Sequence, residues 1–115
     1  MHKLFVIATL SLVAACAGRP EAPSRSEVEA RGARLTQSQC GECHAIGATG
    51  ESPAPEAPPF RTLSRNYRVA NLQEALAEGI SVGHPAMPQF EFAPEDVDAI
   101  IAYLESIQEP PTAAP

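Results

Sequence analysis

The stretch Cys40-Gly41-Glu42-Cys43-His44 constrains this chain more than any other, because it sets two of the three cysteines three positions apart and a histidine directly behind the second. On a helical turn, cysteines at this spacing project their sulfurs to one side. Two such sulfurs match the two vinyl groups on neighbouring pyrroles of a haem, and each can form a thioether. His44 then lies beneath the iron as a proximal ligand. The motif predicts one covalently bound haem c, held by Cys40 and Cys43.

A redox disulfide and a zinc site are the alternatives for a C-x-x-C pair. A thioredoxin-like disulfide occurs within a βαβ pattern, and the sequence has no alternating strand pattern of useful length. A zinc site would need His84 as well as Cys40, Cys43 and His44, at a spacing that is irregular for two cysteines and two histidines. Haem attachment therefore explains the motif better than either alternative.

The segment GHPAMPQF holds the candidates for a second axial ligand. Met87 is the only methionine besides Met1, and the prolines at 85 and 88 exclude a helix and stiffen the loop around it. A methionine more often fills a gap in a core, but Met87 belongs to no apolar helical stripe. His84 is the rival ligand, and an open or exchangeable position is the third possibility. We expect His44 and Met87 to be the axial ligands of the iron.

The N-terminus reads as an export signal, with Lys3 followed by an apolar run of about ten residues. That run is too short to span a bilayer, which needs roughly 20 apolar residues. Its end resembles a bacterial lipobox, in which Cys16 is lipidated and becomes the mature N-terminus. The alternative is ordinary cleavage after Ala17. We expect a signal peptide over residues 1–15 and a protein exported to the bacterial periplasm and anchored to the membrane by lipid at Cys16.

The rest of the chain divides into a flexible spacer over residues 16–25, one domain over residues 26–108 and a disordered tail over residues 109–115. Loss of the signal removes the only lysine, which leaves seven basic residues against fourteen acidic ones and a net charge near −7. Such a charge excludes nucleic acid as a partner. It suits either basic protein partners or solubility alone.

Three helices are predicted and no strand, so the expected fold class is all-α. The first begins at Ser26, which forms a capping box with Glu29. The second begins at Asn71 and ends before Gly79, which is expected to adopt the left-handed conformation. The third has Pro94 at its first position. Its apolar stripe has helical spacing and consists of Val97, Ile100, Ile101, Leu104 and Ile107.

The sequence resembles the small monohaem class I cytochromes c of bacteria over nearly the whole mature chain. Gly32, eight residues before Cys40, stands where that family has a glycine at the contact between its first and last helices. Ile101-Ala102-Tyr103-Leu104 is similar to the family's last-helix pattern. Met87 falls where the family has its distal methionine. The resemblance implies a cytochrome c fold, with three main helices and long loops wrapped around the haem, and Tyr103 packed near Gly32.

The segment Ala57-Pro58-Pro59-Phe60 resembles the family's Gly-Pro-x-Leu segment. The resemblance implies that Pro58 offers its carbonyl to the far nitrogen of His44, which orients the ring. Thr36 departs from the pattern, because many relatives have an aromatic residue there. The absence of lysine from the mature chain is a second departure, so the partners of the lysine-rich mitochondrial relatives are not carried over.

A six-coordinate His/Met iron has no open position for a substrate, so we expect a monomeric electron carrier rather than an enzyme. It would shuttle single electrons between membrane or periplasmic redox proteins. A second hypothesis makes the chain a haem subunit of a larger oxidoreductase. A third is ligand sensing or peroxidase-like chemistry, which requires that Met87 is not a stable ligand. Candidates for binding the haem propionates are Arg61, Arg65, Tyr67 and Arg68.

Overall fold

The computed structural model describes residues 20–79 and 86–110. In this part of the chain there are helices and loops but no strand, which confirms the all-α prediction. None of the described helices has the length and apolar character needed to cross a membrane. The signal peptide, Cys16, His84 and the tail beyond Pro110 lie outside the described residues. The helices in chain order are α1 (Arg25–Cys40), the 3-10 helices η1 (Phe60–Arg65) and η2 (Val69–Asn71), α2 (Leu72–Glu78) and α3 (Pro94–Ser106).

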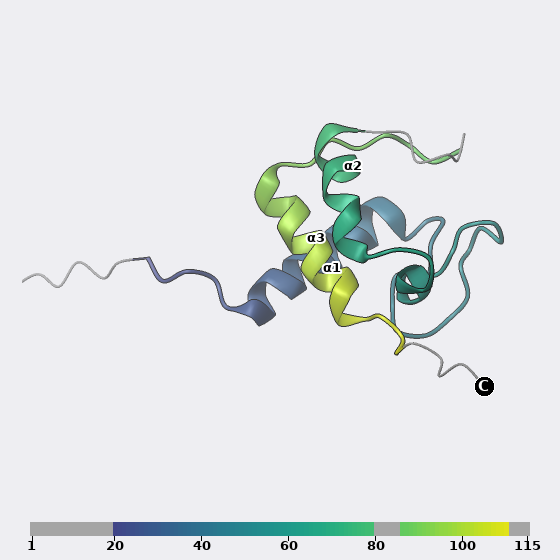
Figure 1. The fold of residues 1–115 in the computed structure, drawn as a ribbon, viewed down its shortest axis with the longest axis horizontal. Helices are drawn as coiled ribbons and strands as arrows, with labels where there is room; N and C mark the ends of the chain where they lie inside the picture. The colour runs from purple at the N-terminus through teal and green to yellow at the C-terminus, as the bar shows by residue number, and fades with distance from the viewer. Residues whose placement is uncertain (1–19, 80–85, 111–115) are drawn as a thin grey trace, which may run out of the picture.

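The helices α1 and α3 cross at Gly32, and α2 lies beside α3 (Figure 1). A Cβ atom at Gly32 would come within 2.6 Å of the carbonyl carbon of Ala99 and 2.7 Å of Cβ of Tyr103. It would lie closer still to the carbonyl oxygen of Ala99. Only glycine permits this approach, so the contact implied by the family resemblance is present in the structure.

The start of α1 corrects the sequence prediction. Ser24, rather than Ser26, is the N-cap, and its hydroxyl accepts a hydrogen bond from the backbone N–H of Glu27. The carboxylate of Glu27 accepts a bond of 2.7 Å from the backbone N–H of Ser24, which completes the capping box. Glu29 instead pairs with Arg25 at 2.7 Å on the helix surface. The predicted boundary at Ser26 is therefore wrong by two residues.

The other helix limits agree with the sequence. Gly79 ends α2 with φ of 69°, and its N–H donates to the carbonyl of Ala75. Pro94 opens α3, and Glu95 and Asp96 follow in the first turn, where negative charge is favourable. Both predictions are confirmed.

Glu109, the first residue of the predicted tail, is held against η1. The backbone N–H of Glu109 donates to the carbonyl of Arg61 at 2.9 Å, and its carboxylate pairs with Arg61 and Arg65. The residues that make these contacts lie far apart in sequence, so the composition of the tail gave no indication of them.

The core is a small apolar cluster between α3 and the segment that contains η1 and η2. Phe60 and Leu63 come from η1, and Val69 comes from η2. The side of α3 predicted from its spacing supplies Val97, Ile100, Ile101 and Leu104. Ile107 lies just past the helix and packs against this cluster while partly buried.

Thr36 is the most completely buried polar residue described, with 0% exposure. Its hydroxyl lies 3.0 Å from the carbonyl oxygens of both Gly32 and Ala33. The hydroxyl therefore donates within its own helix, and burial leaves no polar atom of Thr36 unsatisfied. Threonine at this position donates its hydrogen bond within α1 and is small enough for the close crossing of α1 with α3.

Replacing Tyr103 with phenylalanine is expected to lower the free energy of unfolding by about 1 kcal/mol. The Tyr103 hydroxyl donates to the carbonyl of Ile46 at 2.8 Å and ties α3 to the loop that follows the cysteine motif. Burial raises the pKa of Tyr103, so this contribution is present at neutral pH and is lost as pH rises through the raised value.

Chemical denaturation of the holoprotein measures the effect of Tyr103→Phe, with Ser38→Ala as the control. Ser38 is exposed, and its hydroxyl donates within α1 to the carbonyl of Leu35. We expect less than about 0.5 kcal/mol from the control. Equal losses from the two variants would contradict the role given to the Tyr103 hydroxyl.

Candidate functional site

The cysteine motif forms the turn in which α1 ends. The backbone N–H groups of Cys43 and His44 both donate to the carbonyl of Cys40, at 3.1 and 2.9 Å. This turn leaves Cys40 half-buried and Cys43 exposed. The sequence expectation of a helical turn at the motif agrees with this geometry.

Cys40 lies on the apolar side of the turn. Burial, with a smaller contribution from neighbouring Cys43, raises the pKa of the Cys40 thiol to about 11. The thiol is therefore neutral at physiological pH and is a poor nucleophile or metal ligand without further activation. This environment fits a sulfur that faces an apolar group better than it fits a redox cysteine.

The imidazole of His44 is oriented by a backbone carbonyl. Its Nδ1 atom lies 2.8 Å from the carbonyl oxygen of Pro58. A carbonyl can only accept, so Nδ1 carries the proton and Nε2 keeps the lone pair that a metal ligand needs. The carbonyl of Pro59 is occupied by the hydroxyl of Thr62 at 2.8 Å, which leaves the Pro58 carbonyl as the acceptor for the histidine.

The ring of Phe60 packs on the imidazole of His44, with centroids 4.5 Å apart and planes tilted by 31°. Phe60 belongs to the segment that resembles the family's Gly-Pro-x-Leu segment, but its contact with His44 was not predicted from the sequence. Phe60 itself is held by its backbone N–H, which donates to the carbonyl of Ala45 at 2.9 Å. A carbonyl and an aromatic ring thus fix His44 from two directions.

A cavity of about 480 Å³ opens beside His44, within the range of ligand and cofactor pockets. Cys40, His44 and Met87 all border it. A second, smaller cavity of about 130 Å³ shares these three residues and is also bordered by Cys43. All four residues predicted to attach the haem or ligate its iron are therefore brought together around two cavities with a common wall.

The apolar side of α2 faces the larger cavity and also packs against the edge of the core. No residue of α2 is buried, yet Leu72, Ala75 and Leu76 line the cavity. Leu63, Phe92 and Leu104 line it from other elements. A wall of this composition, with Cys40 and His44 on it and Cys43 on the adjoining smaller cavity, fits a large apolar group, so the residues present suit a haem.

Met87 lies among the described residues of its loop and is half-buried. It borders both cavities together with Pro88 and Phe90, whose ring stacks on Phe92 at 5.5 Å. The rival ligand His84 lies outside the described residues.

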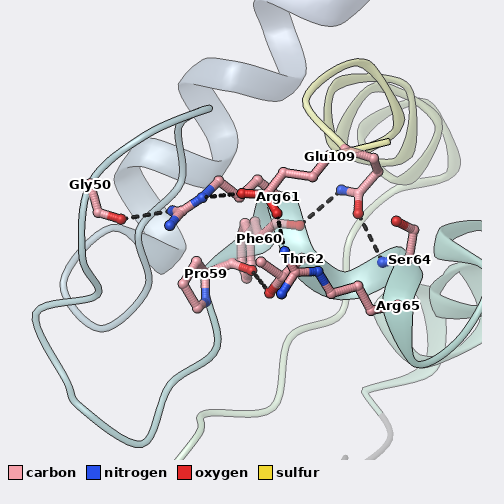
Figure 2. Close-up of polar contacts among 9 residues, drawn as sticks. Gly50, Pro59, Phe60, Arg61, Thr62, Ser64, Arg65 and Glu109 are labelled. Carbon is pink, nitrogen blue, oxygen red and sulfur yellow. Dashed lines mark hydrogen bonds and ion pairs between the residues drawn. The ribbon is translucent and has the colours of Figure 1, made fainter. Parts of the chain in front are cut away.

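The polar residues of the larger cavity wall are Asn66, Tyr67 and Asn71. Of these, only Tyr67 was a candidate in the sequence analysis. Arg61 and Arg65 instead pair with Glu109 and do not line the cavity (Figure 2). Asn66 lies directly after η1 and Asn71 is the last residue of η2, positions that become apparent only once those helices are placed.

A family model described as "Cytochrome C oxidase, cbb3-type, subunit III" matches residues 27–104, more than half of the chain. The chain belongs to this family of c-type cytochrome domains. The match covers most of α1, the cavity and most of α3, which are the elements that bring the site residues together. No curated protein and no solved structure matched the chain.

Membership of this cytochrome family settles the cofactor and the broad activity. The cytochrome domain binds one c-type haem covalently, as the cysteine motif predicted. The family carries out haem-based electron transfer, either as a carrier or as part of an oxidase complex. The prediction of a small monohaem cytochrome c is confirmed.

Proposed function

We propose that the chain is a one-electron carrier whose haem is attached through Cys40 and Cys43 and whose axial ligands are His44 and Met87. The observation that carries the proposal is the convergence of these residues on one cavity wall. In addition, Nδ1 of His44 donates a hydrogen bond to the Pro58 carbonyl. Bound haem supplies the one-electron iron couple. The protein supplies the orientation, the apolar surroundings and the two axial ligands.

Each residue has a separate role in this proposal. Pro58 fixes the His44 ring and makes Nε2 more basic. Met87, as a thioether ligand, favours the reduced state and raises the reduction potential. Asn66, Tyr67 and Asn71, the polar part of the wall, are the groups available to the haem propionates. No acid–base or nucleophilic role is assigned to His44.

Addition of carbon monoxide to the reduced holoprotein at neutral pH tests the carrier function. A stable Met87 ligand leaves no open position, so we expect an unchanged absorption spectrum. Rapid binding would contradict the carrier proposal and would favour ligand sensing or peroxidase-like chemistry. Myoglobin serves as the control for the gas solution.

The family description favours a second candidate, a haem subunit of a larger oxidoreductase, because it names a subunit of an oxidase. A free carrier migrates as a small monomer when membranes are solubilised in mild detergent. Stable migration with a large complex, traced by the haem of this chain, would support the subunit instead. In either case we propose redox proteins as the partners.

We further propose that the protein is periplasmic and is held on the membrane by lipid at Cys16. The N-cap Ser24 lies eight positions after Cys16, which allows a reach of roughly 28 Å at about 3.5 Å per residue. Mass spectrometry of the mature N-terminus is expected to show a diacylglyceryl cysteine. Cys16→Ser should move the haem protein from the membrane to the soluble periplasmic fraction, and an unlipidated N-terminus after Ala17 would contradict the anchor.

A further inference from the structure

Gln108 and Glu109, which come after α3 and its C-cap Ile107, form what we name the C-terminal latch. The side-chain amide of Gln108 donates to the carbonyl of Phe60 at 2.8 Å and to the carbonyl of Leu104 at 2.7 Å. Its oxygen accepts the backbone N–H of Ser64 at 2.8 Å. One half-buried glutamine therefore joins the end of α3 to both ends of η1.

Glu109 adds a charged part to the latch. Its backbone N–H donates to the carbonyl of Arg61, and its carboxylate accepts from Nε of Arg61 at 2.9 Å and also pairs with Arg65. Arg61 continues the connection, because its guanidinium donates to the carbonyl of Gly50 at 2.7 Å (Figure 2). The Arg61 side chain is only 15% exposed, so this pair is less screened by solvent than an ordinary surface ion pair.

The helix η1 needs support of this kind. It is six residues long, whereas 3-10 helices of more than three or four residues are uncommon, because their hydrogen-bond geometry is poor. No side chain caps its first turn. The latch supplies side-chain and backbone partners to the carbonyls of Phe60 and Arg61 and to the N–H of Ser64.

A shift of η1 would move two groups that contact His44. Phe60 is the first residue of η1, and its ring lies on the imidazole. Two residues earlier is Pro58, whose carbonyl accepts from Nδ1 of His44. Pro58 and Pro59 both have a φ angle fixed by their rings, so few backbone torsions between Phe60 and the Pro58 carbonyl are free to absorb a shift.

We propose that the C-terminal latch is a positioning device for the proximal histidine, which holds the Pro58 carbonyl and the Phe60 ring on His44 and so helps to set the reduction potential. The inference rests on the proposed function, in which His44 ligates the iron. The bond from Nδ1 to Pro58 makes Nε2 a stronger donor and favours the oxidised state. Loosening of the latch therefore raises the potential.

The test uses Gln108→Ala in the holoprotein, because it removes three latch contacts and leaves the net charge unchanged. Gln73→Ala, at an exposed position on α2, is the matched control. Two quantities are measured: the midpoint potential, and the rate at which the Nδ1 proton of His44 exchanges with solvent in the reduced protein, by NMR. We expect a higher potential and roughly tenfold faster exchange in Gln108→Ala, with no change in the control.

A second pair of variants covers the case in which Gln108→Ala yields too little holoprotein. Glu109→Gln removes the latch charge, and Asp96→Asn removes the same charge from the Arg31 pair between α1 and α3. Because both variants lose one negative charge, a general electrostatic effect on the potential is common to them. The proposal expects a larger rise in the midpoint potential in Glu109→Gln than in Asp96→Asn. It expects faster exchange of the Nδ1 proton in Glu109→Gln only.

The outcomes separate the latch from the function on which it rests. Reduced stability of the latch variants with wild-type potential and proton exchange would overturn the positioning role and leave the latch purely structural. A wild-type holoprotein without the resonances of an iron-bound histidine would instead overturn the ligand assignment of His44. Changes in both potential and exchange that exceed those of the matched controls would support the proposal.

Discussion

Replacement of Gly32 by alanine is expected to lower the free energy of unfolding by about 3 kcal/mol or more. The new Cβ would lie 2.6 Å from the carbonyl carbon of Ala99, and a backbone atom in the middle of α3 cannot rotate away. The helices must therefore separate. Alanine recovers at most about 1 kcal/mol through its higher helix propensity, which does not offset the clash.

Denaturant unfolding followed by helical circular dichroism measures this loss in the holoprotein. Gly47→Ala is the control, because a Cβ there would have no neighbour nearer than 3.8 Å, and Gly47 has no positive φ angle. We expect the control to stay within about 0.5 kcal/mol of the wild type. Equal stability of Gly32→Ala and Gly47→Ala would mean that α1 and α3 do not cross at Gly32.

Replacement of Met87 by alanine is expected to lower the reduction potential by on the order of 100 mV, a fraction of the ~0.8 V range that axial ligands span. A thioether stabilises the reduced iron, and its loss removes that preference. The variant should also bind carbon monoxide, because an axial position becomes open. Potentiometric titration and absorption spectra with the gas measure the two effects.

His84→Ala is the control for Met87→Ala, because His84 is the rival ligand in the same loop. It should keep the wild-type potential and exclude carbon monoxide. If His84→Ala lowers the potential while Met87→Ala does not, the distal ligand is the histidine. Met87, at the wall of both cavities, would then have a packing role only.

The parts of the fold that depend on local patterns could be predicted from the sequence. Gly79 and Pro94 mark helix limits through their own backbone preferences, which neighbouring elements do not change. The start of α1 was predicted wrongly, because two Ser-x-x-Glu patterns overlap and both satisfy a capping box. The structure uses Ser24 with Glu27, which frees Glu29 to pair with Arg25.

The parts of the site that depend on distant contacts could not be predicted from residue types alone. Arg61 and Arg65 suit haem propionates by chemistry, but Glu109, more than forty positions away, pairs with both. The same contact holds Glu109, the first residue of the predicted tail, against η1. The cysteine motif itself was readable, because its spacing matches the geometry of the group that it binds.

The absorption spectrum of the purified wild-type holoprotein, oxidised and reduced, tests the central claim most directly. A covalent haem with His44 and Met87 as axial ligands predicts the weak near-red band of methionine sulfur on ferric iron, lost on reduction. An oxidised spectrum without that band would contradict the His44/Met87 site.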